Sequence, residues 1–118
     1  MKRRVLIVDD IADIRLMLRC LIEQEGYVIV AEAANGAEAV ECYREHLPDI
    51  TIMDIDMPVK TGVEAAREIR AMEKSARIIF CSGRVRGGER PFFEGGVPLG
   101  ALVPKPFLPN QLLQAMKM

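Results

Sequence analysis

The sequence lacks an excess of charge of either sign, a paired cysteine motif and a long hydrophobic run. Its formal net charge at pH 7 is -1, so nothing argues for bulk attraction to nucleic acid or to a membrane. The three cysteines, Cys20, Cys42 and Cys81, form no CxxC pair. Such a scattered, odd-numbered set is typical of reduced thiols in a cytoplasmic protein.

No apolar stretch is long enough to cross a bilayer, and we expect no membrane insertion. The basic start is followed by an apolar run that ends at Asp9, which is too short for a signal peptide. Half of the 118 residues are hydrophobic, and a chain of this length can bury one core without disulfides. We therefore expect residues 1–118 to form a single domain, without repeats or linkers.

Short β-branched runs alternate with segments whose apolar residues recur at helical spacing. The runs at 5–8, 28–31, 50–54, 78–81 and 102–103 predict strands, and residues 14–22, 35–43, 63–72 and 109–116 predict helices. Asn35, with Glu38 three residues later, predicts the start of the second helix. From 84 to 100 the pattern is rich in Gly and Pro, so a fourth helix there is expected to be short or irregular, with at most one or two turns at 89–94. The alternation predicts an α/β fold with a doubly wound, five-stranded parallel sheet.

Polar residues stand where four of the predicted strands end: Asp9 with Asp10, Asp54, Ser82 and Lys105. The carboxyl ends of parallel strands share one edge of the sheet, where ligands bind in open α/β folds. Carboxylates brought together repel one another and favour a cation, and oxygen ligands suit Mg²⁺. Ser and Lys side chains can hold phosphoryl oxygens. An aspartate such as Asp54 can then act as a nucleophile that forms an acyl phosphate.

These residues resemble the receiver domain of two-component response regulators. The motifs that carry the resemblance are VLIVDD at 5–10, IMDIDMP at 52–58 followed by Gly62, CSG at 81–83 and KPF at 105–107. Together they span nearly the whole chain, and the stretch 31–40 adds a further match. The chain is most similar to the small, stand-alone chemotaxis regulators of this family.

The resemblance implies a flavodoxin-like sheet of strand order 2-1-3-4-5, an order for which a chemotaxis receiver is a known example. It also implies that Asp54 accepts a phosphoryl group from a phosphohistidine of a sensor histidine kinase. The implied cofactor is Mg²⁺, with Mn²⁺ as a substitute, held by Asp9, Asp10, Asp54 and the backbone carbonyl of Asp56. The protein would then be a signalling domain that acts on a downstream protein, without turnover of an external substrate.

The same resemblance assigns roles near the end of the chain. Ser82 and Lys105 are implied to hold the phosphoryl oxygens, and Lys105-Pro106 is expected to be a cis peptide. Asp56 and Arg84 are implied to flank the path of the hydrolytic water and to tune the lifetime of the acyl phosphate. Leu102 departs from the family pattern, because that position usually carries a Tyr or Phe that reports phosphorylation.

The resemblance also places the partner surface on the expected fourth helix, the strand at 102–103 and the final helix. Receivers often pair through this face, so the resemblance is compatible with a homodimer as well as with a monomer. No direct contact with nucleic acid is expected.

Four alternatives remain from the sequence. The chain is compatible with a receiver excised from a longer transcriptional regulator, or with a degenerate receiver that no longer responds to phosphate. The pair Asp54 and Asp56 also resembles the aspartate motif of haloacid dehalogenase-type phosphatases, but that motif lies near the N-terminus and requires later acidic motifs that are missing here. A flavodoxin-type cofactor binder would need a Ser/Thr/Gly phosphate loop after the first strand, where this chain is acidic.

Overall fold

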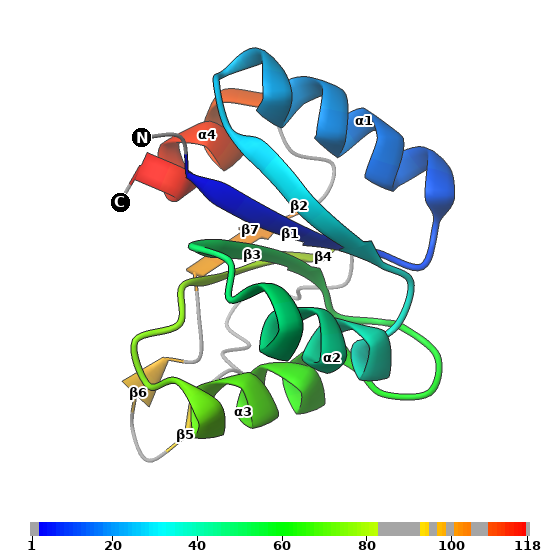
Figure 1. Ribbon diagram of the computed structural model, residues 1–118, viewed down its shortest axis with the longest axis vertical. Coiled ribbons are helices and arrows are strands. Elements are labelled where there is room, and N and C mark those ends of the chain that lie inside the picture. The colour runs from blue at the N-terminus through cyan, green and yellow to red at the C-terminus, as the bar shows by residue number, and fades with distance from the viewer. Residues whose placement is uncertain (1–2, 83–92, 95–96, 99–100, 105–108, 118) are drawn as a thin grey trace.

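The computed structural model describes residues 3–82, 93–94, 97–98, 101–104 and 109–117, with side chains for 3–81 and 110–117. Strands and helices alternate along most of this chain (Figure 1). The elements are β1 (Arg4–Val8), α1 (Ala12–Gln24), β2 (Val28–Ala33), α2 (Gly36–His46), β3 (Ile50–Asp54), α3 (Gly62–Met72), β4 (Ile78–Ser82), β5 (Phe93–Glu94), β6 (Val97–Pro98), β7 (Ala101–Pro104) and α4 (Pro109–Lys117).

The main sheet has five parallel strands in the order β2-β1-β3-β4-β7. With β7 as the fifth strand of the main sheet, this is the predicted order 2-1-3-4-5, and the fold is the flavodoxin-like α/β fold. Crossovers between parallel strands require the intervening helices, which explains why the two periodicities alternate along the sequence. On β2, the register against β1 shifts between Ile29 and Ala31, so Val30 is an extra residue there.

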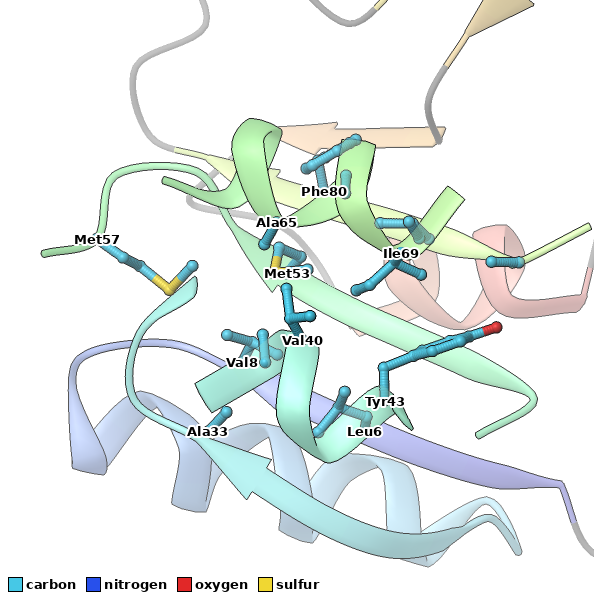
Figure 2. Packing of buried hydrophobic residues seen from close by; sticks show 14 residues of the cluster. Leu6, Val8, Ala33, Val40, Tyr43, Met53, Met57, Ala65, Ile69 and Phe80 are labelled. Carbon is cyan, nitrogen blue, oxygen red and sulfur yellow. The ribbon is translucent and has the colours of Figure 1, made fainter. Parts of the chain in front are cut away.

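Two hydrophobic clusters lie on opposite faces of the sheet because successive strand residues point to opposite sides. Helices α2 and α3 cover one face and α1 and α4 the other (Figure 1). Figure 2 shows the first cluster, in which Leu6, Val8 and Met53 of the strands pack against Val40 of α2 and Ile69 of α3. The second cluster is formed by Val5, Ile7, Ile50, Ile52, Ile79, Cys81, Leu18, Ile22, Leu112 and Met116. Burial on both faces explains the nearly continuous apolar runs of the central strands.

Side-chain caps fix the starts of α2 and α3. The Asn35 side chain accepts a hydrogen bond from the Glu38 N–H at 2.9 Å, as the sequence predicted. Thr61 and Glu64 form a reciprocal capping box, in which each side chain bonds to the backbone N–H of the other residue. The bond from the Thr61 N–H, followed by a bond from the Thr61 side chain, lowers the pKa of the Glu64 carboxyl below its ordinary value. The second cap begins α3 at Gly62, directly after the loop that follows β3.

Met17 and Met72 continue the helical spacing and lie in α1 and α3 as expected, although they are 52% and 41% exposed. One detail of the expected helices is wrong. Residues Phe93 and Glu94 were expected to belong to a helical turn, but they pair in an antiparallel manner with Val97–Pro98. The Gly-Gly sequence between the two pairs favours a hairpin over a helix. The rest of the expected fourth helix, at 83–92, lies outside the described residues.

The cysteines and the helices were the subject of two expectations from the sequence: reduced thiols and no membrane insertion. All three cysteines are free thiols: Cys20 is exposed, Cys42 half-buried and Cys81 buried. Among the described residues, none of the helices combines the length and the apolar character needed to cross a membrane.

Candidate functional site

Three carboxylates meet at the carboxyl-terminal edge of the sheet. Asp9 and Asp10 directly follow β1, and Asp54 is the last residue of β3. These strands are neighbours, with Val8 opposite Met53, so the three side chains converge. One ligand oxygen from each carboxylate lies within 4.8 Å of the others. Asp9 is buried, Asp54 half-buried and Asp10 exposed, so the cluster is rooted in the protein and open to solvent on one side.

The buried residue of the cluster, Asp9, is held by backbone and side-chain bonds. Its N–H donates to the Ala33 carbonyl at 3.1 Å, and its carboxylate oxygen Oδ1 accepts from the Ile11 N–H at 2.9 Å. Its carbonyl accepts from Nη1 of Arg15 at 2.7 Å, and the Arg15 Nε donates to Glu32 at 3.2 Å. The sequence analysis missed Arg15 and Glu32. The available signal was a basic residue in the first turns of the helix after the aspartate pair, since helical side chains point back toward the N-terminus.

The loop after β3 is folded tightly against Asp54. The Ile55 N–H donates to Asp54 Oδ1 at 2.9 Å, and the Ile55 carbonyl accepts from the Gly62 N–H at 2.8 Å. A Cβ atom at Gly62 would lie 2.0 Å from the Asp54 carbonyl oxygen, which only glycine avoids. Two residues before Gly62, the Lys60 carbonyl accepts from the Gly36 N–H at 3.1 Å. The carboxylate of Asp54 is therefore positioned by a loop that is held at both ends.

The remaining predicted site residues are described in part or not at all. Ser82 ends β4 one residue beyond Cys81, the residue opposite Asp54, so its backbone reaches the same edge of the sheet. Leu102 lies in β7 opposite Phe80, and Asp56 is exposed in the loop after β3. Three further predicted residues lie outside the described residues: Arg84, Lys105 and Pro106.

The donor set of the cluster consists of oxygen atoms alone. Three carboxylates this close repel one another unless a cation lies between them. Hard cations such as Mg²⁺ take oxygen ligands and retain several waters, and the exposed side of the cluster leaves room for water and substrate oxygens. The residues present therefore fit a divalent cation of this kind.

A hollow among the described residues lies elsewhere. It has a volume of about 600 Å³ and opens at the opposite, amino-terminal edge of the sheet, where its lining includes Arg3, Asp49, Glu73 and Arg77. None of the clustered aspartates lines it, and we assign the chemistry to the cluster because the three carboxylates converge there and not at the hollow.

Comparison with known proteins agrees with this arrangement. The chain is 42% identical to the chemotaxis protein CheY of Bacillus subtilis over 118 residues, which cover 98% of this chain and 96% of the relative. It is equally similar to the CheY of Thermotoga maritima, with 42% identity and the same coverage.

Among solved structures, a complex of CheX with CheY, BeF₃ and Mg²⁺ from Borrelia burgdorferi contains a chain with a similar fold. The TM-score is 0.86 at 31% identity, and the match covers 97% of this chain and 86% of that one. The profile of the response regulator receiver domain matches residues 5–117. The chain belongs to the response regulator receiver domain family.

Proposed function

We propose that residues 1–118 work as one receiver domain that is switched by phosphorylation of Asp54. A sensor histidine kinase supplies the phosphoryl group from a phosphohistidine, and the phosphorylated form acts on a downstream protein in a chemotaxis-type pathway. The observation that carries this proposal is the meeting of the Asp9, Asp10 and Asp54 carboxylates at one edge of the sheet. Receiver domains generally bind Mg²⁺ at such a cluster, and they are signalling domains without turnover of an external substrate.

The proposed chemistry begins at the Asp54 carboxylate. One of its oxygens attacks the phosphorus of the donor, a new P–O bond forms, and the P–N bond to the donor imidazole breaks. The Ile55 N–H, bonded to Asp54 Oδ1, orients the carboxylate for this attack. Bound Mg²⁺ would neutralise negative charge on the transferring group.

The residues that would hold the ion are the carboxylates of Asp9, Asp10 and Asp54 and the backbone carbonyl of Asp56. The buried Asp9 is fixed by its bond from Ile11, whereas the exposed Asp10 can adjust to the ion. Mn²⁺, which also accepts carboxylate and water oxygens, is a plausible substitute.

Ser82 and Lys105 are proposed to hold the oxygens of the transferred group. Ser82 ends β4 one residue after Cys81, which pairs with Asp54. Ser82 itself pairs with Pro104, and Lys105 is the next residue in the sequence. A lysine ammonium is a compact charge suited to a phosphoryl group. Lys105-Pro106 as a cis peptide stays a prediction, because both residues lie outside the described part of the chain.

Exposed apolar residues at the start of α1 support docking of a protein donor. Ile11, Leu16 and Met17 are 51%, 59% and 52% exposed, and α1 starts three residues after Asp9. Exposed apolar side chains of this kind can bury against a helical partner that presents its phosphohistidine to Asp54.

The output step is proposed for the face that includes β7 and α4, with a homodimer through this face as a further arrangement. Leu102 of β7 has no aromatic ring or hydroxyl, so it cannot provide the inward movement of a Tyr or Phe ring that usually accompanies phosphorylation in this family. Asp56 and Arg84 are proposed to tune hydrolysis, and Arg84→Ala should change the lifetime of the acyl phosphate. Equal phosphate release from Arg84→Ala and the parent protein would contradict that role.

A small acyl-phosphate donor with Mg²⁺ tests the proposal, with the intact mass as the readout. The parent protein should gain one phosphoryl group, and Asp54→Asn should gain none. Asp49→Asn is the matched control, because Asp49 is exposed at the other edge of the sheet and bonds to the Arg4 N–H; this variant should behave like the parent. A parent protein without any gain of mass would favour a degenerate receiver.

The cellular setting is part of the same proposal. Three free thiols fit a reducing compartment, and we propose the cytoplasm. The source of the chain, as a stand-alone regulator or as one part of a longer transcriptional regulator, is decided by the stop codon of the natural gene.

A further inference from the structure

Arg15 is a cation that is built into the acidic edge of the sheet from α1. Its guanidinium donates from Nη1 to the Asp9 carbonyl at 2.7 Å and from Nε to Glu32 Oε1 at 3.2 Å. The side chains of Arg15 and Glu32 are only 19% and 29% exposed, so this pair is well shielded from solvent. Glu32 also holds Arg19, whose Nη1 lies 3.0 Å from Glu32 Oε2. Arg15 is thus anchored on β2 and directed at the peptide between two of the clustered aspartates.

The bond from Arg15 bears on the orientation of that peptide. The Asp9 carbonyl belongs to the peptide plane that connects Asp9 to Asp10, so fixing the carbonyl restricts the direction in which the Asp10 side chain leaves the backbone. Asp9 already has bonds at its N–H and its carboxylate. The bond from Arg15 to the Asp9 carbonyl adds a restraint on the peptide that leads to Asp10, the exposed member of the cluster.

The charge of Arg15 works in the opposite direction. A cation near a Mg²⁺ site repels the ion, so its charge by itself would weaken metal binding. Glu32 offsets that charge, which lets Arg15 keep its bond to the Asp9 carbonyl at a smaller electrostatic cost. The two effects of removing Arg15 therefore have opposite signs: lost positioning weakens Mg²⁺ binding, and lost charge strengthens it.

We propose that Arg15 is a positioning residue for the cation and phosphoryl site, acting through the Asp9 carbonyl, with Glu32 as its anchor. The inference rests on the proposed function, because it concerns the same cluster. Residues that orient metal ligands from behind typically contribute 10–100-fold to affinity, and we expect an effect of about that size here.

Isothermal titration of the unphosphorylated protein with Mg²⁺ tests the inference. Arg15→Met retains much of the apolar stem and should bind Mg²⁺ at least about 10-fold more weakly than the parent. Arg15→Lys keeps the positive charge and a hydrogen-bond donor but lacks the planar guanidinium. Its Mg²⁺ affinity should therefore lie between those of the parent and of Arg15→Met. The matched control is Arg70→Met, because Arg70 makes a similar bond to the Lys74 carbonyl at 2.8 Å away from the cluster; its affinity should equal that of the parent.

Mg²⁺ affinity of Arg15→Met equal to that of the parent overturns the inference, since Arg15 would then be structural only. Tighter binding overturns it too, because charge alone would account for the change. If thermal unfolding shows that Arg15→Met does not fold, Arg15→Lys decides: weaker binding supports the inference and unchanged binding overturns it. Absence of Mg²⁺ binding by the parent overturns the proposed function itself, which separates that failure from a failure of Arg15 alone.

Discussion

Gly62→Ala is the most informative single change, because it adds one methyl group where the structure has no space. The new Cβ would lie 2.0 Å from the Asp54 carbonyl oxygen and 3.0 Å from the Ile55 Cα. Both neighbours are backbone atoms, so neither can rotate away. The loop and the start of α3 must separate by about 1 Å or more, since close-packed interiors contain no spare volume.

The cost follows from two effects. Overpacking of this kind costs about 1–3 kcal/mol, and separation endangers the bond of the Gly62 N–H to the Ile55 carbonyl, a further loss of about 1 kcal/mol. The better helix propensity of alanine returns less than about 1 kcal/mol. We expect the free energy of unfolding to fall by about 2–3 kcal/mol, which lowers the Tm by about 10 °C.

The same displacement moves Asp54, so phosphorylation should suffer as well. A misplacement of about 1 Å can cost about 100-fold in rate. The assays are urea unfolding for stability and the rate of mass gain with an acyl-phosphate donor. The control is Gly26→Ala, whose Cβ meets nothing within 4 Å but whose φ of +89° strains a side chain. It should lose about 1 kcal/mol and keep the parent rate. Parent-like stability and rate in Gly62→Ala would refute the reasoning.

Three further predictions concern stability and thiol reactivity. Thr51 is fully buried, and its hydroxyl has no hydrogen-bond partner among the described residues; Thr51→Val should therefore raise the free energy of unfolding by about 1 kcal/mol, and a loss of stability in urea would contradict this. The pKa of Glu64 is lower in the folded protein than its ordinary value of 4.5. Its ionised carboxylate therefore stabilises the fold at pH values above 4.5, and this stabilisation is lost as the pH falls through the lower, folded-state pKa. The stability difference between the parent and Glu64→Gln should thus narrow in acid unfolding series; a constant difference would count against the cap. Burial is the main cause of the raised pKa of the Cys42 thiol, followed by the charges of the nearby Glu38, Glu45 and Glu41. A thiol reagent at mildly alkaline pH should therefore modify the exposed Cys20 before Cys42. Mass spectrometry after timed quenching shows the order of labelling, and faster labelling of Cys42 would contradict this prediction.

The sequence predicted most of the fold because its local signals agree with its tertiary structure. The apolar run at 50–54 is continuous because β3 is covered on both faces, and Asn35 caps α2 through its own side chain. Exposure of Met17 and Met72 could not be predicted from spacing alone. A helix buries only as wide a face as the sheet beneath it can cover, and methionine tolerates both environments.

The meeting of Asp9, Asp10 and Asp54 could be predicted because parallel strand ends share one edge. The contacts of Arg15 could not, because a guanidinium can reach many acceptors, and the choice of the Asp9 carbonyl depends on where β2 places Glu32. The close approach of Gly62 to Asp54 likewise depends on the path of the loop. In the sequence, Gly62 indicated only a turn before a helix.

The extra residue of β2 has a consequence for the behaviour of the protein in concentrated solution. β2 is one border of the main sheet, and a border strand with unpaired backbone groups can recruit another chain. Val30 interrupts the regular pleat of this border, and Glu32 places a charge two residues further along it. An incoming strand would have to follow an irregular ladder and desolvate an ion pair. The anchor of Arg15 thereby also discourages this border from seeding aggregates.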